Sequence, residues 1–540
     1  MKMKYALVRA KAAAVMAVIL TVLSAVLALN VNAAQIIDNG DYIYKLNEDG
    51  KTLSIINYKG NSLYLKLPSK VDKYYVTVIE SAAFMYNDTI KDLEISETIK
   101  EIKSNAFSEC KSLKKLTVPE NVKVIGDSAF CNCTVLKTVK ISEGIQKIGN
   151  YCFVGCESLS ELTLPQKIDE IGEYAFFGCS ELEKIDLPKS FKRFGGYALE
   201  GTKWMSNQKS EFVVVGDGLL LKYNGNGDKI VIPDKVKIIG ECAFAKNQKI
   251  REAEVSKNVS RIEKSAFSEC AKLEKIKFNG NVVSIGQSAF KDCISLDEVK
   301  LEKLEKISAN CFENCRSMQS VKIPDSVKII EKGAFKSCYM LQKAEMGKGV
   351  EKVEESVFED CTSLKRLEFF EKLKEISALT CVNCHSLTRV EFHSEVTVPS
   401  LAFSDCIHLS EAVFYKTPKN IAINAFNHCS EKFSLYASDT SGVEKFAEKN
   451  KYELKGVNQL SLYEDKGILT PDDETEKSVF AGGHTAIIVI ILLADCGIVL
   501  FFAMYVLLSR TSKRGKKSND KSDVKAQPRH SKSTQKNKKE

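Results

Sequence analysis

One pattern of apolar and polar positions recurs along most of this chain at intervals of 22 or 23 residues. The segments NVKVIGDSAFCNCTVLKTVKI (121–141) and NVSRIEKSAFSECAKLEKIKF (258–278) share the frame V-x-x-I-x-x-x-A-F-x-x-C-x-x-L-x-x-I-x-I. A fixed period of this length is typical of a solenoid, in which each coil buries its apolar side chains only against neighbouring coils. The pattern therefore predicts a stack of coils.

The position of Phe in this frame marks about 15 repeats. It falls at Phe84, Phe107, Phe130, Phe153, Phe176, Leu199, Phe244, Phe267, Phe290, Phe312, Phe335, Phe358, Cys381, Phe403 and Phe426. Every step is 22 or 23 residues except the step from Leu199 to Phe244, which is 45. That longer step nearly equals two coils, so the register of the repeat continues beyond it.

Each coil is expected to contain one short strand and one helical turn. Leu116 and Val118 alternate with polar residues, which predicts a strand with two side chains inside and two outside. Pro119 lacks an N–H group and ends the strand. Stacked coils place such strands side by side in a parallel β ribbon. The segment around each Ala-Phe pair is long enough for only one helical turn, so the fold class is an α/β solenoid.

The flanking and interrupting segments predict β structure of their own. Residues 35–78 form an N-terminal β cap, residues 79–429 the solenoid and residues 430–455 a C-terminal cap. Two apolar segments around Gly216-Asp217-Gly218 predict a β-hairpin insertion within 200–235. Trp204 precedes it and is the only tryptophan. We expect this side chain to anchor the hairpin by packing; the alternative is an exposed ligand contact.

The two ends of the chain carry membrane signals. Residues 1–34 combine a basic start, an apolar run and a small-residue exit, which is typical of a secretory signal peptide. Residues 485–508 are apolar enough and long enough for one transmembrane helix. The tail 509–540 holds 12 Lys or Arg and three acids, so it is expected in the cytoplasm against anionic lipid. Residues 456–484 would then be a stalk outside the cell.

The net charge of +8 comes from the two ends. The part of the chain between them is mildly acidic, which argues against a nucleic-acid partner.

Cysteine follows the repeat. Twelve of the 18 cysteines lie three residues after the Phe position. They are Cys110, Cys133, Cys156, Cys179, Cys270, Cys293, Cys315, Cys338, Cys361, Cys384, Cys406 and Cys429. Other repeats place Asn87, Thr202 or Asn247 there, and these residues share with Cys a small polar side chain that can bond to turning backbone. We therefore expect this cysteine ladder to consist of free, buried thiols rather than disulfides or metal ligands. Cys381 and Cys384 form a C-x-x-C motif, but both should point inward.

The repeat frame resembles the BspA-like leucine-rich repeats of bacterial surface proteins over about residues 79–429. The resemblance implies a right-handed leucine-rich repeat coil and a protein that adheres to, or binds, a ligand without catalysis.

The sequence shows no group of acid, base and nucleophile residues that would indicate a catalytic site, and no motif that implies a cofactor. His385, His393, His408 and His428 fall at different positions of successive coils, so we do not expect them to cluster.

The best candidate for ligand contact is the outward face of the strands, at the positions eight and ten residues after the Phe position, which we call the ribbon surface. The candidate residues are Lys115, Lys140, Glu161, Lys184, Glu252, Glu254, Lys275, Lys277, Glu298, Lys300, Lys322, Lys343, Arg366 and Arg389. Glu368 and Glu391 occupy the same positions. Both signs of charge alternate there and aromatic residues are missing, which favours an extracellular protein or polysaccharide partner over a sugar-stacking groove. The alternative is cross-strand pairing in a structural spacer that has no specific ligand.

Overall fold

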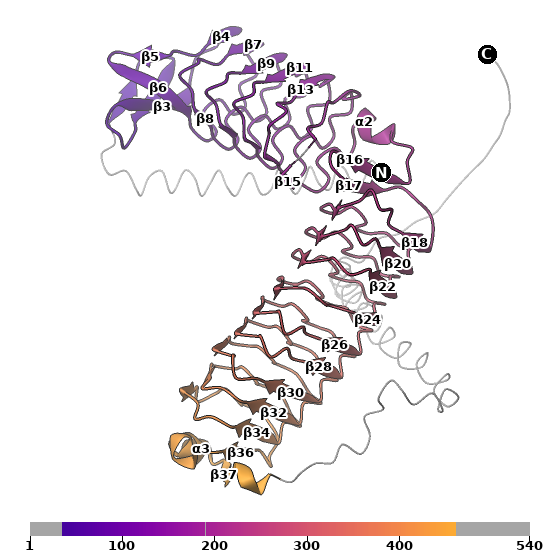
Figure 1. Cartoon of the computed structure of the whole chain (residues 1–540). Coiled ribbons are helices and arrows are strands. Elements are labelled where there is room, and N and C mark those ends of the chain that lie inside the picture. Colours follow the sequence, from indigo (N-terminus) through magenta and orange to yellow (C-terminus); the bar gives the residue numbers. More distant parts are fainter. Residues whose placement is uncertain (1–34, 190, 461–540) are drawn as a thin grey trace, which may run out of the picture. The chain divides into compact units, whose positions relative to one another are not determined.

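The computed structural model describes residues 35–189 and 191–460, which form a series of stacked coils (Figure 1). The predicted signal peptide, transmembrane helix and basic tail, and all but the first five residues of the predicted stalk, lie outside the described residues. Within the described residues, no helix has the length and apolar character needed to cross a membrane.

Each coil contributes two short strands, so the solenoid has two parallel β ribbons where the sequence predicts one. In Figure 1 the two ribbons follow opposite edges of the first coils, β7 to β13 on one side and β8 to β15 on the other. Equivalent residues of neighbouring coils pair in register, as Val139 does with Leu116 and Leu162. The ribbon with longer strands is the predicted one, and we call it the wide ribbon. The second, narrow ribbon consists mostly of two-residue strands.

The wide ribbon comprises three sheets: β4 (Tyr64–Lys66), β7 (Asp92–Glu94), β9 (Lys115–Val118), β11 (Thr138–Ile141) and β13 (Glu161–Thr163); β18 (Lys229–Val231), β20 (Glu252–Val255), β22 (Lys275–Phe278) and β24 (Glu298–Val299); and β26 (Ser320–Lys322), β28 (Lys343–Glu345), β30 (Arg366–Phe369), β32 (Arg389–Phe392), β34 (Glu411–Phe414), β36 (Ser434–Ala437) and β37 (Glu453–Gly456).

The narrow ribbon continues from the terminal cap and from an internal hairpin: β1 (Ile36–Asp38), β2 (Tyr42–Leu46), β3 (Thr52–Tyr58), β5 (Lys70–Val71), β6 (Tyr74–Ile79), β8 (Glu101–Ile102), β10 (Val124–Ile125), β12 (Lys147–Ile148), β14 (Glu170–Ile171) and β15 (Arg193–Phe194); β16 (Phe212–Val215), β17 (Leu219–Tyr223), β19 (Ile238–Ile239), β21 (Arg261–Ile262) and β23 (Ser284–Ile285); β25 (Lys306–Ile307), β27 (Ile329–Ile330), β29 (Lys352–Val353) and β31 (Glu375–Ile376); and β33 (Thr397–Val398) and β35 (Asn420–Ile421).

The expected helical turns are absent from the described coils, so the α/β assignment is wrong and the fold is a β-solenoid with little helix. The helices are α2 (Lys203–Ser206), α3 (Glu444–Asn450) and the 3-10 turns η1 (Thr440–Gly442) and η2 (Val457–Gln459). In the Ala-Phe segments two residues adopt positive φ, such as Asn105 at 58° and Glu109 at 63°, which a right-handed helix excludes. The Phe107 N–H group instead donates to the carbonyl of Ala129 in the next coil, at 2.7 Å.

The interior is a column of parallel phenylalanine rings. Phe335 is fully buried and stacks on Phe312 and Phe358, with ring centroids 5.4 and 5.7 Å apart. The column is interrupted where Cys381 occupies the Phe position. There Phe392, from the wide ribbon, contacts Phe403 edge-on at 6.1 Å. Most apolar burial therefore lies along the axis of the stack, between successive coils.

Each cysteine of the ladder joins its coil to the preceding one. The Sγ atom donates to the main-chain carbonyl at the Phe position of that coil, as Cys110 does to Phe84 and Cys338 to Phe312, both at 3.2 Å. All twelve cysteines make this bond, at 3.0 to 3.3 Å. The ladder therefore consists of tethers between neighbouring coils, and all the cysteines in the described part of the chain are free thiols.

The repeats that lack cysteine lie where a stack of coils begins or ends. Asn87 and Asn247 occupy the first repeat of their respective stacks, and each side-chain oxygen accepts main-chain N–H bonds from its own coil. Thr202 occupies the last repeat before the interruption and caps α2 by accepting from the Met205 N–H group. Asparagine at this position thus marks the first repeat of a stack, whereas Thr202 marks the last repeat before the interruption.

The interruption divides the interior into two apolar clusters, one over residues 44–205 and one over residues 220–447. We call the corresponding parts, residues 35–205 and 211–460, the first and second stack. Trp204 packs against the cluster of the first stack, which agrees with the packing interpretation.

The hairpin β16–β17 begins the second stack as β2–β3 begins the first. Both are antiparallel pairs with one irregularity in register. Tyr58 packs against Phe84 and Tyr223 against Phe244 with tilted rings, whose centroids are 5.2 Å apart in both cases. The sequences that follow, YKGN from Tyr58 and YNGN from Tyr223, also match. The segment in which the sequence predicts an insertion therefore acts as a second, internal cap.

Candidate functional site

The ribbon surface is exposed over most of its length. Lys115, Lys140, Glu161, Lys184, Lys275, Lys277, Glu298, Lys300, Lys322, Lys343 and Arg366 are exposed, and Glu252, Glu254 and Arg389 are partly buried. The neighbouring positions on each strand face the core, as Ile276 does between Lys275 and Lys277. The alternation predicted from the sequence therefore describes the strands correctly.

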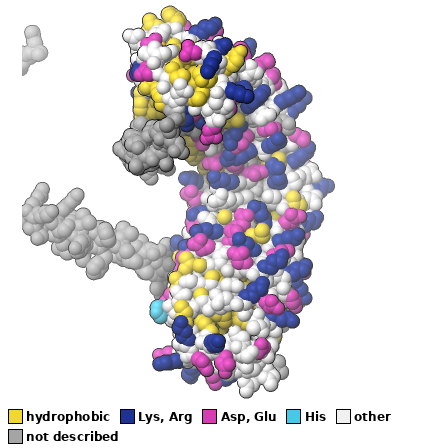
Figure 2. Space-filling model, turned by 90° about the vertical axis from the view of Figure 1, so that its left-hand side faces the viewer, with side chains coloured by type: hydrophobic (Ala, Val, Ile, Leu, Met, Phe, Trp, Pro, Cys, Tyr) yellow, Lys and Arg dark blue, Asp and Glu magenta, His cyan; other side chains and the backbone are white. Residues whose placement is uncertain are grey.

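Many charges of the ribbon surface pair across coils. Lys229 contacts Glu252 at 2.8 Å, and Lys277 contacts Glu254 at 3.2 Å. In Figure 2 basic and acidic side chains intersperse over the face in view. Pairs this exposed are screened by solvent and contribute little to stability, so they remain free to exchange partners with a charged ligand.

Three wide-ribbon strands near the C-terminal end depart from the expected surface. Phe370, His393 and Tyr415, twelve residues after the Phe position, form a column of stacked rings. The Tyr415 hydroxyl donates to Glu391 at 3.1 Å. Glu391 was expected to face outward, but its side chain is only 3% exposed because these rings and the arginine side chains cover it. Aromatic residues are therefore present beside the ribbon surface, although not within it.

The same region brings Glu368, Glu391 and His393 close enough to hold a metal ion. However, Glu391 already forms ion pairs with Arg366 and Arg389, and His393 contacts Glu368 at 2.9 Å. A cation would have to displace two guanidinium groups, so this arrangement fits an internal charge network better. The other three histidines of the region do not join the cluster, as their positions in the repeat predict.

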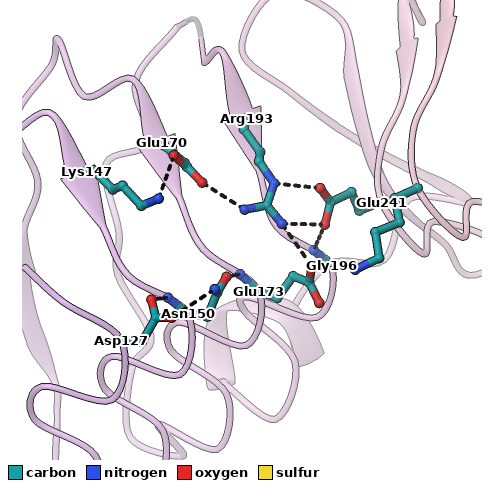
Figure 3. Close-up of polar contacts among 9 residues, drawn as sticks. Asp127, Lys147, Asn150, Glu170, Glu173, Arg193, Gly196 and Glu241 are labelled. Carbon is teal, nitrogen blue, oxygen red and sulfur yellow. Dashed lines mark hydrogen bonds and ion pairs between the residues drawn. The ribbon is translucent and has the colours of Figure 1, made fainter. Parts of the chain in front are cut away.

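The junction between the two stacks is held by a second charge network (Figure 3). Arg193 donates to Glu170 and Glu173 of its own stack, at 2.7 and 2.9 Å. Its Nε atom donates to Glu241 of the second stack at 2.9 Å. Glu241 also accepts from the Gly196 N–H group at 3.0 Å. Its side chain is only 6% exposed, so Arg193 neutralises a buried carboxylate that belongs to the other stack.

A side-chain ladder leads through the first stack to this network (Figure 3). Asp127 accepts from the N–H group of Asn150 at 2.8 Å, and Asn150 accepts from that of Glu173 at 2.9 Å. Lys264 of the second stack then reaches Glu173 at 2.8 Å. These residues are equivalent in successive repeats, but the long step in the repeat hides their proximity across the junction.

We expect Arg193→Met to weaken the contact between the stacks. The substitution leaves Glu241 buried without its cation, which costs about 1–2 kcal/mol after allowance for partial exposure of the arginine. Trp204 fluorescence reports on the first stack alone, whereas circular dichroism reports on both. Urea unfolding should therefore show coincident curves for wild type and separated curves for the variant.

The matched control is Lys192→Met, which removes an exposed pair with Asp169 of the same stack. Its two unfolding curves should remain coincident, with a loss below about 1 kcal/mol. Equal effects of the two substitutions would contradict the assigned role of Arg193.

Burial suppresses the ionisation of the thiols in the described part of the chain. Burial raises the pKa of Cys156 to about 11 and of Cys338 to about 12. It also raises the pKa values of Cys381 and Cys384 in the C-x-x-C motif. The thiolate is the nucleophile and the metal ligand, and the raised pKa values keep these groups protonated. The ladder thiols among them, Cys156, Cys338 and Cys384, donate to backbone carbonyls.

Comparison with known proteins places the chain in a family. The model of the BspA type leucine rich repeat region matches residues 77–205, 221–342 and 328–450, which is more than half of the chain. The chain belongs to the BspA-type leucine-rich repeat family. The gap between the first two matches, residues 206–220, contains β16, so this BspA-type repeat region is interrupted at the junction of the two stacks.

Several solved structures resemble this BspA-type protein. A leucine rich cell surface protein from Faecalibacterium prausnitzii A2-165 is 23% identical over 74% of this chain and 98% of its own, with a TM-score of 0.29. A leucine-rich repeat protein from Bacteroides ovatus is 20% identical over 74% and 99%, with a TM-score of 0.31. One from Eubacterium ventriosum is 21% identical over 63% and 92%, with a TM-score of 0.39. No curated protein matches the sequence.

Proposed function

We propose that this protein displays its solenoid outside the cell as a binding surface for a protein or charged polymer, and that it carries out no chemistry. The predicted signal peptide at 1–34 and membrane segment at 485–508 support an anchored location, with the tail 509–540 in the cytoplasm. The ribbon surface is the proposed contact region, and adhesion is the proposed role.

One observation carries this proposal. Positions that point inward hold nearly the same residues in every coil, whereas the ribbon surface keeps exposed charged side chains that vary from coil to coil. Folding of the stack constrains the residue type only at the inward positions. An extended face of varied charges can distinguish partners by electrostatic complementarity, which governs specificity and association rate more than affinity.

The test is charge reversal on one strand. Lys275→Glu combined with Lys277→Glu changes two exposed side chains of β22 and leaves buried Ile276 in place. We expect the full-length variant to bind about tenfold more weakly, because each rim charge contributes modestly. The measurement is saturable binding to a panel of extracellular-matrix proteins and sulfated polysaccharides at two salt concentrations.

The control reverses Lys257 and Lys272, which are exposed but lie outside the ribbon surface. It changes the net charge equally and should bind like wild type. If wild type binds nothing on the panel, the structural spacer becomes the better description, since the cross-coil pairs such as Lys229 with Glu252 then serve solubility alone.

A further inference from the structure

Three consecutive coils place a tyrosine two residues before the Phe position. Tyr151, Tyr174 and Tyr197 adopt φ values of 57°, 56° and 57°. Most of the other residues with positive φ at this position are small: Ala82, Asn105, Ser128, Cys242, Ser265, Ser288, Asn310, Gly333 and Ser356. We call the three residues the tyrosine ladder.

The fold does not require tyrosine at these positions. A left-handed backbone costs a residue with a β-carbon about 1–2 kcal/mol, and asparagine tolerates it better than a bulky residue. Most other coils close with small side chains at this position, the exceptions being Leu379 and Leu401, and they stack equally well. Bulky residues held in such a conformation concentrate at sites that bind ligands, so the ladder marks a candidate site.

The three rings form a ladder along the axis of the stack. Centroids of successive rings are 5.2 Å apart, with interplanar angles of 5° and 28°. Tyr151 is 44% exposed. Burial raises the pKa of Tyr174 to about 12, so its hydroxyl group keeps its proton. Within residues 35–189 and 191–460, the hydroxyl groups of Tyr151 and Tyr174 have no hydrogen-bond partner.

The ladder ends in a hollow of about 220 Å³ at the junction of the stacks. Tyr174 and Tyr197 line it from the first stack, and Ser265 and Ser268 line it from the second. Charges of both signs also line it, and several pair with each other, as Lys264 does with Glu173 at 2.8 Å. The hollow therefore combines aromatic rings, hydroxyl groups and nearly balanced charge.

We propose that the tyrosine ladder and this hollow form a binding site for a neutral glycan chain. Because the rings stack on one another at 5.2 Å, Tyr174 offers a ligand its edge and hydroxyl group rather than its faces. A sugar can meet such a polar aromatic edge with both its hydroxyl and its C–H groups. The ladder offers such rings at regular spacing, and the hollow adds hydroxyl donors and paired charges. A strongly charged ligand would have to break the Lys264–Glu173 pair.

This site is distinct from the ribbon surface. The tyrosines follow the narrow-ribbon strands β12, β14 and β15, whereas the ribbon surface belongs to the wide ribbon. The proposed glycan site therefore does not depend on the charged contacts of the proposed function. The proposed glycan site also uses residues of both stacks. The interruption of the repeat thereby creates a site that no single coil could provide.

The test compares binding of short neutral oligosaccharides of glucose, N-acetylglucosamine and mannose by the full-length chain, on an array and then by calorimetry with the strongest binder. The variant carries Tyr151→Asn, Tyr174→Asn and Tyr197→Asn, which introduces a residue that other coils use at this position. We expect a melting temperature close to that of wild type and binding at least about tenfold weaker.

Three further outcomes decide the proposal. The matching Tyr→Phe variant keeps the rings and should lose less affinity than the asparagine variant. Ser265→Ala with Ser268→Ala alters the opposite wall and should also weaken binding, while Lys275→Glu with Lys277→Glu should leave it unchanged. Absence of binding by wild type, or undiminished binding by the folded asparagine variant, would overturn the proposal.

Discussion

Raising the pH from neutral to about 10 should unfold the two stacks in a steep transition, because the cysteine ladder binds its protons more tightly in the folded state than in the unfolded state. Burial raises the pKa values of Cys270 and Cys338 to about 12. An unfolded cysteine has a pKa of about 8.5. The folded chain thus keeps protons that the unfolded chain releases.

The direction of the effect follows from this difference. The contribution of each thiol is fully present below about pH 8.5 and is lost as the pH rises towards the folded pKa, at about 1.4 kcal/mol per pH unit. At pH 10 each deeply buried thiol therefore disfavours the folded state by about 2 kcal/mol. Summed over the buried thiols of the ladder, this loss outweighs the roughly 5–15 kcal/mol by which domains are typically stable.

The measurement is circular dichroism from neutral pH to about pH 11, which covers the range in which unfolded cysteine ionises. Titration of thiols in the alkali-unfolded protein, without reductant, should find nearly all the cysteines of residues 35–460 free. A variant with Cys315→Ala, Cys338→Ala and Cys361→Ala has fewer titrating groups and should show a shallower pH dependence. A chain that stays folded at pH 11, or that yields few thiols, would contradict the ladder of free thiols.

Phe335→Ala should destabilise the second stack by about 3–5 kcal/mol, because truncation of a buried aromatic ring removes its apolar burial and leaves a cavity. Phe335 lies between two parallel rings at 5.4 and 5.7 Å. Coils contact only their neighbours, so the gap separates the coils on either side of it. Urea unfolding followed by circular dichroism measures the loss.

The control for this substitution is Tyr339→Ala, in the same coil. Tyr339 is 36% exposed and contacts Arg316 through its ring face at 5.6 Å. Its loss should cost no more than about 1 kcal/mol. Similar losses for the two variants would show that the ring column is not the main source of stability.

The sequence predicts the parts of the fold that repeat. The Phe column, the cysteine ladder and the outward alternation at Lys275 and Lys277 follow from the period, because a contact made once is made in every coil. The narrow ribbon escapes prediction because two residues are too few for an alternating pattern. The prediction of a helical turn in each coil was wrong because the positive φ of residues such as Asn105 is not evident from residue type.

Contacts that occur only once in the structure leave no periodic pattern in the sequence. Glu391 is buried by Phe370, His393 and Tyr415, which occupy a position that the frame leaves unspecified. Arg193 and Glu241 are 48 residues apart, and the interrupted repeat hides that they meet. The tyrosine ladder is visible in the sequence as three residues at one position, but only the backbone conformation shows that these residues are unusual.

The internal cap has a consequence for how the chain folds. A stack of coils can grow only from a surface that already offers paired backbone, and hairpins form such a surface from residues close in sequence. This chain has two, β2–β3 and β16–β17, so each stack has its own nucleus. As synthesis proceeds, the first stack can complete before residues beyond 210 exist, and a stalled or damaged second stack need not undo it.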